Sequence, residues 1–277
     1  MTGTSQIVIK KPGQKETANR DFNFTEDLIR FSPENQEINQ YRRDAWKLFQ
    51  SLPIPGNRDE AWRRTDLEKL DVSGFTPPSR NLFQRLEPVP EDLRKPLTAD
   101  AHGGEITLMP GGVEIHLDPS LSARGVVFTD LVTAEKSYPE ILQKILGKVV
   151  KPSEGKFAAL AGALSQNGVL LYVPSGVNIE QPLHSLLWGP GSGLALISHI
   201  LVYLEEGSSV TYVHEAASPV DEKGQKLHAG LVEAYIGPAA KLRWVELQSW
   251  GENVWNFSHE RVKVERDGEM DWVFGAI

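Results

Sequence analysis

The chain has 277 residues and no cysteine, and its 29 Lys and Arg against 37 Asp and Glu give a formal charge of −8. The absence of thiols excludes a disulfide scaffold, a zinc finger, a cysteine-ligated cluster and a cysteine nucleophile within this chain. The acidic balance disfavours nucleic acid as the main partner, because phosphate binding needs clustered cations. No apolar run approaches the roughly 20 residues of a membrane span. The polar N-terminus lacks a signal-peptide core, so a cytoplasmic location is expected.

The first part of the chain predicts a tail followed by helices. Residues 1–24 are polar and aperiodic, which predicts a flexible tail. An N-terminal helical region is predicted at residues 25–98. In it, Ser32 caps a helix that begins at Pro33, and apolar residues recur at helical spacing as far as Phe49. A second helical piece is expected at 59–64. Five prolines between residues 76 and 96 favour extended chain that joins this region to the rest.

Residues 99–166 predict a connecting region of mixed α and β structure. Two apolar segments, 105–108 and 113–117, flank a Pro-Gly-Gly sequence, which is typical of a hairpin. Residues 126–128 predict a short strand. Helical apolar spacing predicts helices at 138–146 and 156–164.

From residue 167 to residue 277 the apolar runs become short, β-branched and aromatic, and they repeat. One run precedes and another follows each of Gly176, Gly207, Gly237 and Gly268, which are 31, 30 and 31 residues apart. Such units predict stacked coils of a β-solenoid, because each unit can bury its apolar face only against its neighbours. An antiparallel meander of evenly spaced hairpins is the alternative that the period leaves open.

Motifs with known chemistry are sparse. The glycine-rich segment 189–193 lacks the Lys-Ser/Thr of a phosphate-binding loop and predicts a tight turn. The seven histidines form neither the His-x-His pair of a cupin nor the His-Glu-x-x-His of a zinc protease. His214, which precedes Glu215, is the strongest candidate metal ligand, but a hydrogen-bonded core histidine is favoured over it. A carbohydrate-active solenoid enzyme with exposed carboxylates and a cupin-like metal protein stay open as alternatives.

Several segments, taken in order, resemble the SufB/SufD family of iron–sulfur cluster assembly proteins. They are residues 59–67, 156–160, 167–177, 207–212, 227–229, 248–250, 255–257 and 264–268, and the resemblance covers roughly residues 55–277. It implies an α+β fold in which an N-terminal helical region is followed by a right-handed parallel β-helix and a C-terminal helical domain. The chain stops at Ile277 in the middle of a repeat. We therefore expect a C-terminally truncated member with an incomplete β-helix at 167–277 and without the C-terminal domain.

The resemblance also implies partners. In the family, SufB and SufD pair through their β-helices, each binds the ATPase SufC through its C-terminal domain, and the assembly builds iron–sulfur clusters. For this chain it implies a SufB-like partner bound through β-helix pairing and a SufC-like ATPase bound through the missing C-terminal domain. A homodimer is a further expectation, because an uncapped solenoid exposes unpaired strand edges.

Two departures from the SufB pattern favour the SufD-like branch. SufB-type members carry a cysteine just after the strand that matches residues 210–213, where this chain has Glu215, and a lysine where it has Glu260. In SufB-type members the residues that match Gln248 and Trp250 line an internal path, whereas here a structural role in the core is equally expected. The resemblance thus implies a non-catalytic SufD-like scaffold, with no metal or cofactor assigned to this chain and the cluster formed by the complex.

Overall fold

The computed structural model describes residues 21–33, 35–94, 102–220 and 223–277. Most of the predicted tail at 1–24 lies outside the described residues. Its last four residues are described, and there Phe22 and Phe24 are only 7% and 8% exposed because their rings stack in a core cluster. Aromatic burial of this kind places residues 21–24 with the folded part of the chain.

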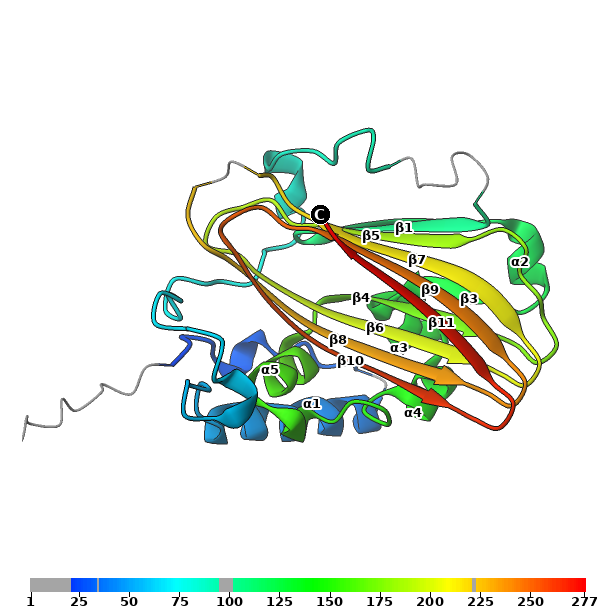
Figure 1. Ribbon diagram of the computed structural model, residues 1–277, viewed down its shortest axis with the longest axis horizontal. Helices are drawn as coiled ribbons and strands as arrows, with labels where there is room; N and C mark the ends of the chain where they lie inside the picture. The colour runs from blue at the N-terminus through cyan, green and yellow to red at the C-terminus, as the bar shows by residue number, and fades with distance from the viewer. Residues whose placement is uncertain (1–20, 34, 95–101, 221–222) are drawn as a thin grey trace, which may run out of the picture.

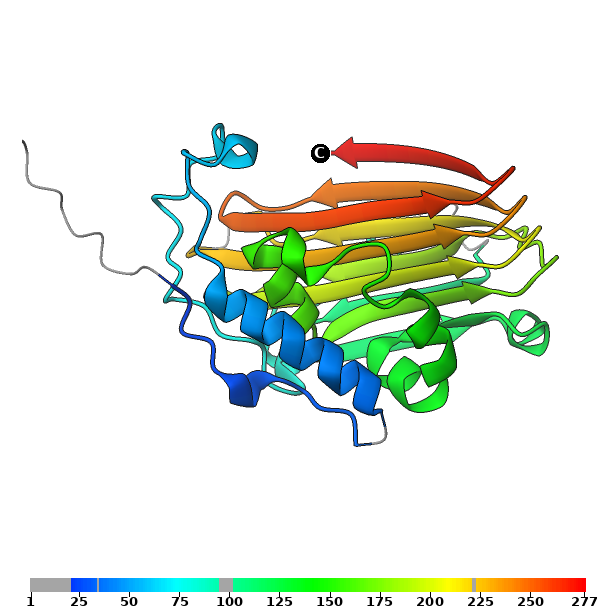
Figure 2. The ribbon, with the colours of Figure 1, turned by 90° about the horizontal axis from the view of Figure 1, so that it is seen from below.

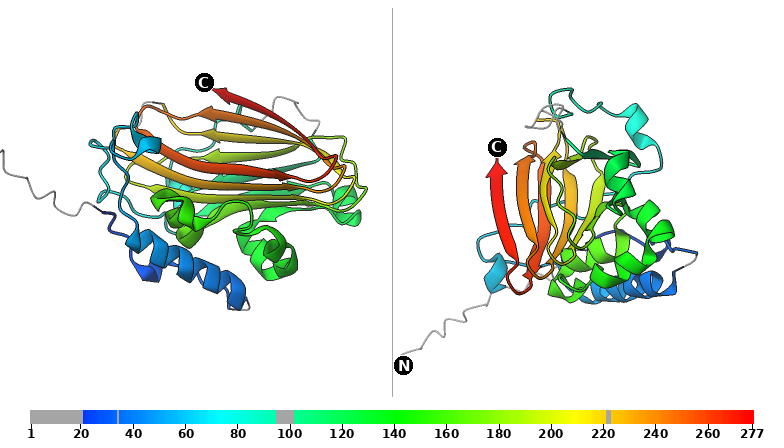
Figure 3. Two further views of the ribbon diagram at one scale, coloured as in Figure 1. Left: turned by 60° about the horizontal axis from the view of Figure 1, so that its bottom comes forward. Right: turned by 90° about the vertical axis from the view of Figure 1, so that its right-hand side faces the viewer.

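The second half of the chain is a two-sheeted parallel β-solenoid (Figure 1). Its strands are β4 (Asn167–Val173), β5 (Leu183–Trp188), β6 (Ala195–Leu204), β7 (Ser209–Ala217), β8 (Lys226–Ile236), β9 (Lys241–Ser249), β10 (Val254–Val264) and β11 (Glu269–Ala276). Successive strands alternate between the sheets and stack as layers along the molecule (Figure 3). Strands that neighbour each other within β4–β11 are parallel. This pairing confirms the predicted solenoid and excludes the meander.

Both sheets are completed by strands from the connecting region. One sheet has six strands in the order β11-β9-β7-β5-β1-β2, where β1 (Gly104–Met109) and β2 (Gly112–Leu117) form the predicted antiparallel hairpin. The other has five strands in the order β10-β8-β6-β4-β3, and β3 (Val127–Asp130) pairs antiparallel to β4. The two antiparallel contacts lie at the same end of the solenoid, so β10 and β11 are the edge strands at its other end.

The four turns at the glycine repeat each contain a residue in the left-handed conformation, and in the first two of them that residue is glycine. Gly176 and Gly207 have φ of 69° and 65°, and the equivalent turns place Ala239 and Asp267 at 55° and 59°. Gly237 lies two residues before Ala239, and Gly268 directly follows Asp267. The register Tyr172–Tyr203–Tyr235–Lys263 gives structural repeats of 31, 32 and 28 residues, so the average period is as predicted and the individual coils differ from it.

The N-terminal region contributes one long helix, α1 (Gln36–Ser51). Its cap is Asn35, whose side chain accepts hydrogen bonds from the N–H groups of Glu37 and Ile38, so the predicted start at Ser32 and Pro33 is wrong. Asn39 explains the difference, because its side chain binds the backbone N–H and C=O of Ser32 and holds that residue outside the helix. The predicted helix at 59–64 is a single 3-10 turn, η2 (Glu60–Trp62).

Helices cover the outer face of the five-stranded sheet (Figure 2). Within this layer α5 (Lys156–Leu164) lies against β6, β8 and β10, and α1 packs on α5. The remaining helical segments are η1 (Glu26–Leu28), η3 (Leu82–Arg85), α2 (Pro119–Ala123), α3 (Leu131–Ser137), α4 (Pro139–Ile145) and η4 (Pro152–Glu154). A second core cluster fills the space between the two sheets, and the candidate site lies in that interior.

Candidate functional site

The interior of the solenoid carries a lane of polar side chains beside its apolar core. Side chains alternate between the two faces of a strand, so every second residue points between the sheets. We call the following hydrogen-bonded residues the polar lane: Ser185, Ser198, Tyr212, His214, His228, Glu246, Gln248, Asn256, Ser258 and Glu260.

Strand register sets the order of the polar lane. On the six-stranded sheet His214 lies opposite Ser185 on one side and Glu246 on the other. On the five-stranded sheet His228 lies opposite Asn256. Residues about 30 positions apart in sequence therefore become neighbours along the solenoid axis, at the strand spacing of roughly 4.8 Å.

One continuous chain of hydrogen bonds runs through the polar lane. Ser198 Oγ lies 2.8 Å from His228 Nε2, and His228 Nδ1 lies 2.7 Å from Asn256 Oδ1. Asn256 Nδ2 donates to Gln248 Oε1 at 2.9 Å, and Gln248 Nε2 donates to Glu246 Oε1 at 2.8 Å. The chain joins the two sheets, because Asn256 is on β10 and Gln248 is on β9.

A second group of hydrogen bonds converges on Ser185. Its Oγ lies 2.6 Å from the hydroxyl of Tyr212 and 2.8 Å from Nδ1 of His214. These three residues are buried, and so are His228 and Glu246. Buried polar groups are costly unless they are hydrogen-bonded, and these bonds give the buried side chains of the polar lane their partners.

Burial sets the protonation states in the polar lane. Desolvation lowers the pKa of His214 to about 3, with the nearby His228 and His184 acting in the same direction. Desolvation also lowers the pKa of His228 to about 4, against the opposing effect of its bond to Asn256. Both imidazoles are therefore neutral at pH 7. The pKa of Glu260 is raised to about 8 by burial and by the carboxylate of Glu246, to which it is hydrogen-bonded.

The structure brings the three residues singled out in the sequence into this interior. Gln248 is a link of the hydrogen-bond chain, and His214 binds Ser185. Trp250 follows β9, and its ring centroid lies 5.2 Å from that of His228, while its buried Nε1 has no hydrogen-bond partner. The role of Gln248 and Trp250 in lining a path stays a prediction. Sequence reasoning missed His228, and the signal that could have found it is its offset of 30 residues from Ser198.

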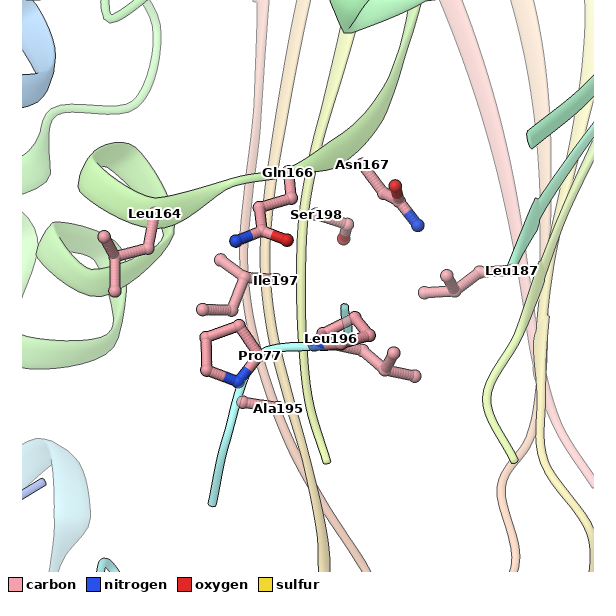
Figure 4. Close-up of a pocket in the computed structure, with 10 residues that line it drawn as sticks. Pro77, Leu164, Gln166, Asn167, Leu187, Ala195, Leu196, Ile197 and Ser198 are labelled. Atoms are coloured by element: carbon pink, nitrogen blue, oxygen red, sulfur yellow. The ribbon is translucent and has the colours of Figure 1, made fainter. Parts of the chain in front are cut away.

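The described part of the chain shows neither a cluster of metal-binding side chains nor, beside Ser198, a cavity larger than a water molecule. Across residues 21–33, 35–94, 102–220 and 223–277, no three His, Asp or Glu side chains are grouped so that they could hold a metal ion. Beside Ser198, a cavity of about 10 Å³ is lined by Gln166, Asn167 and mostly apolar side chains (Figure 4). That volume is about the room that one water molecule needs.

None of the helices in the described part of the chain has the length and apolar character needed to cross a membrane. The longest of these helices, α1, has 16 residues and carries several charged side chains.

Comparisons with known proteins match the solenoid and the region before it. A family model described as "SUF system FeS cluster assembly, SufBD core domain" matches residues 188–277. A second model, described as "SufBD protein N-terminal region", matches residues 113–184. The two matches together cover more than half of the chain.

Curated relatives carry the same family name. Proteins named iron-sulfur cluster assembly SufBD family protein from Staphylococcus epidermidis and Staphylococcus aureus are each 27% identical to this chain, over 266 and 269 residues. One from Staphylococcus saprophyticus is 26% identical over 266 residues. Each match includes 92% of this chain and 56% of the relative, so the chain spans little more than half the length of these proteins. The chain belongs to the SufBD family of iron–sulfur cluster assembly proteins.

Proposed function

We propose that this chain is a SufD-like, non-catalytic scaffold component of the SUF assembly complex. The observation that carries the proposal is the chemistry of the polar lane, whose side chains offer only oxygen and nitrogen atoms. Sulfur transfer through a protein needs a thiolate that attacks and is then released, and the sequence contains no cysteine. A chain of this composition supports cluster assembly by shaping a partner's site.

Glu260 supports the SufD-like assignment. In the family pattern described above, SufB-type members have a lysine at this position, and here a carboxyl group takes its place inside the solenoid next to Glu246. A lysine cation attracts an anionic sulfur species, whereas the carboxyl pair formed by Glu260 and Glu246 repels it. Both effects are strongest where water is excluded. The interior of this chain is therefore unsuited to carry such an anion.

We further propose that a SufB-like protein pairs with the solenoid and that a SufC-like ATPase joins through a part of the protein that this chain does not contain. The cluster would form in that complex, in the cytoplasm, without a metal or cofactor resident in this chain. A homodimer is the competing assembly.

The test is co-expression of the tagged natural full-length protein with SufB-like and SufC-like proteins from the same genome, followed by affinity purification and reconstitution of the cluster. We expect a complex that contains both partners and assembles a cluster, whereas the isolated protein assembles none.

Gln248→Leu should lower thermal stability without slowing assembly by the intact complex, and Glu206→Gln on an exposed turn serves as its control. Failure to bind either partner, or loss of assembly in a stable Gln248→Leu complex, would overturn the proposal.

The alternative of a carbohydrate-active enzyme receives no support from the comparisons. In addition, Glu246 and Glu260 lie inside the solenoid, and Glu205 on an outer turn is hydrogen-bonded to Lys144. A glycosidase needs two carboxyl groups that face each other across a substrate groove, and these carboxyl groups do not form such a pair.

A further inference from the structure

The strand β2 forms a free sheet edge in the middle of the sequence. It pairs with β1 on one side, and among the residues that the structure describes no strand pairs with its other side. Residues 113–116 of β2 are all exposed, whereas β3, the edge strand of the other sheet at this end of the solenoid, is buried over its whole length. Edge strands are often protected by proline, lysine or a bulge, and β2 contains none of these. The strand is therefore open to pairing with a further strand.

Every second residue of β2 directs its backbone groups to this free edge. Directly after the strand, Asp118 N donates to Gly103 O at 2.9 Å. The even-numbered residues of β2 are therefore the ones that bond to β1, because bonded and non-bonded positions alternate in an antiparallel pair. The odd-numbered residues Val113, Ile115 and Leu117 turn their N–H and C=O groups to the opposite side, where they can bond to another chain.

The two faces of β2 carry different side chains. Ile115 lies opposite Ile106, a fully buried residue of the core between the sheets, so the odd-numbered side chains of β2 point toward that interior. Val113 and Ile115 are nevertheless 36% and 42% exposed, because β2 is the last strand on this side of the sheet. Glu114 and His116 point to the outer face. The free edge is thus apolar on its inner face and polar on its outer face.

From these features we infer that two copies of this chain associate through antiparallel pairing of their β2 strands about a two-fold axis at Ile115. In this register Ile115 lies opposite its own copy and Val113 lies opposite the partner's Leu117, so the exposed aliphatic side chains cover one another. Glu114 lies opposite the partner's His116, and the symmetry makes this contact twice. An imidazole has an N–H group for a carboxylate in either of its protonation states. The two six-stranded sheets become one continuous sheet.

Charge selects this register over its neighbours. Bonded positions must face bonded positions, so one strand can slide along the other only in steps of two residues. A slide in one direction places Glu114 opposite the partner's Glu114, and a slide in the other direction places it opposite the partner's Asp118. Like charges directly opposite each other destabilise a strand pair. The sequence of β2 is therefore complementary to itself in one register, which identifies a second copy of the chain as the occupant of this edge.

The surroundings of β2 leave the contact available. Arg94 donates to Oε2 of Glu114 at 2.8 Å, so Oε1 remains for the partner's His116. The pairing uses β2 alone and leaves strands β4–β11 free, so it does not compete with a SufB-like partner that binds through them. It is also independent of the scaffold function, because it needs neither the polar lane nor a second kind of protein.

Sedimentation equilibrium of the full chain tests the inference. We expect a monomer–dimer equilibrium with a dissociation constant below about 100 µM. Glu114→Lys and His116→Glu should each raise that constant at least about tenfold, because each change acts twice across the two-fold axis. An equimolar mixture of these two variants should recover the original affinity, since their heterodimer pairs the new lysine with the new glutamate and keeps one original contact. The control is Arg94→Gln, which breaks the same ion pair with Glu114 as Glu114→Lys does and should leave dimerisation unchanged.

Disulfide cross-linking measures the register itself, because the chain has no cysteine of its own. Non-bonded residues directly opposite each other have Cα atoms about 4.5 Å apart, which suits a disulfide, whereas residues two positions out of register are about 7–8 Å apart. A mixture of Glu114→Cys and His116→Cys should therefore oxidise to a covalent dimer, and neither variant should do so alone. Glu206→Cys on an exposed turn, mixed with His116→Cys, is the control and should stay uncross-linked.

Thermal unfolding confirms that each variant is folded. A protein that stays monomeric at about 200 µM would overturn the inference, since edge pairing at the expected affinity would be visible there. So would a failure of the Glu114→Lys and His116→Glu mixture to recover affinity, or a covalent dimer that Glu114→Cys forms by itself as readily as in the mixture.

Discussion

Glu260 on β10 and Glu246 on β9 come from opposite sheets and share a hydrogen bond inside the solenoid. Glu246 also accepts from Gln248 Nε2 and, at 3.3 Å, from Trp272 Nε1 of β11. Two carboxyl groups this close are stable together only when one of them keeps its proton. The raised pKa of Glu260, about 8, identifies it as the proton donor.

This pair predicts a loss of stability at alkaline pH. Glu260 has a higher pKa in the folded state than the 4.5 of the free group, so the folded state holds a proton that the unfolded chain releases. Stability therefore falls as the pH rises from about 4.5 to about 8. Between pH 6.5 and 8.5 the free energy of unfolding should drop by about 2 kcal/mol, measured by urea denaturation. Glu260→Gln, which still donates to Glu246, should remove this dependence, and an unchanged slope in that variant would contradict the assignment.

The buried histidines predict a second loss of stability on the acid side. The pKa of His228 is lowered from 6.5 to about 4 in the folded state, so below pH 6.5 the unfolded chain binds a proton that the folded state resists. Stability should fall as the pH drops through this range. His228→Gln should make the dependence shallower by at most about 1.4 kcal/mol per pH unit between pH 6 and pH 4.5. A curve that remains parallel to that of the unsubstituted protein would refute this role.

Glu233 holds the segment between α4 and η4 against the sheet. Its fully buried carboxylate accepts hydrogen bonds from the N–H groups of Gly147, Val149 and Val150, and from Nε2 of His199. Glu233→Gln places an amide N–H where donors converge, so we expect the free energy of unfolding to fall by about 2–4 kcal/mol. The exposed Glu206→Gln should cost less than about 0.5 kcal/mol. Similar losses for the two variants in denaturant titrations would rule out this anchoring.

The cap of α1 gives a prediction about a single residue. Asn35→Ala should lower the free energy of unfolding by about 1 kcal/mol, since two N–H groups of the first turn lose their acceptor. Ser32→Ala is the matched comparison and should cost clearly less, because its backbone rather than its side chain is bound by Asn39. Chemical denaturation of both variants measures the difference. A larger loss for Ser32→Ala would restore Ser32 as the cap.

Local patterns in the sequence were sufficient for much of the fold. Helical spacing predicted α5, and alternation around Pro-Gly-Gly predicted the β1–β2 hairpin. The glycine spacing predicted stacked coils of about 30 residues, and ordered motifs indicated the family. These features depend on neighbours along the chain or on a repeated unit, which a sequence displays directly.

The sequence alone did not predict β5. The apolar residues that directly follow Gly176, Val177 and Ile179, flank only an isolated bridge at Asn178, and the strand itself begins at Leu183. Nor did it predict that Ala239 and Asp267 take the left-handed turn positions. Each coil has its own turn length, and a shift of one residue moves every later side chain to the other face of its strand.

The composition thus established that this chain has no thiol, and the repeat established that it forms coils. Only the tertiary structure decided that His228 contacts Ser198 and Asn256, that Glu260 contacts Glu246, and that Trp62 lies beside Phe257. The physical reason is that these contacts join residues brought together by strand register and by packing between sheets and helices. Such contacts depend on where every turn begins and ends, which is settled when the whole solenoid packs together.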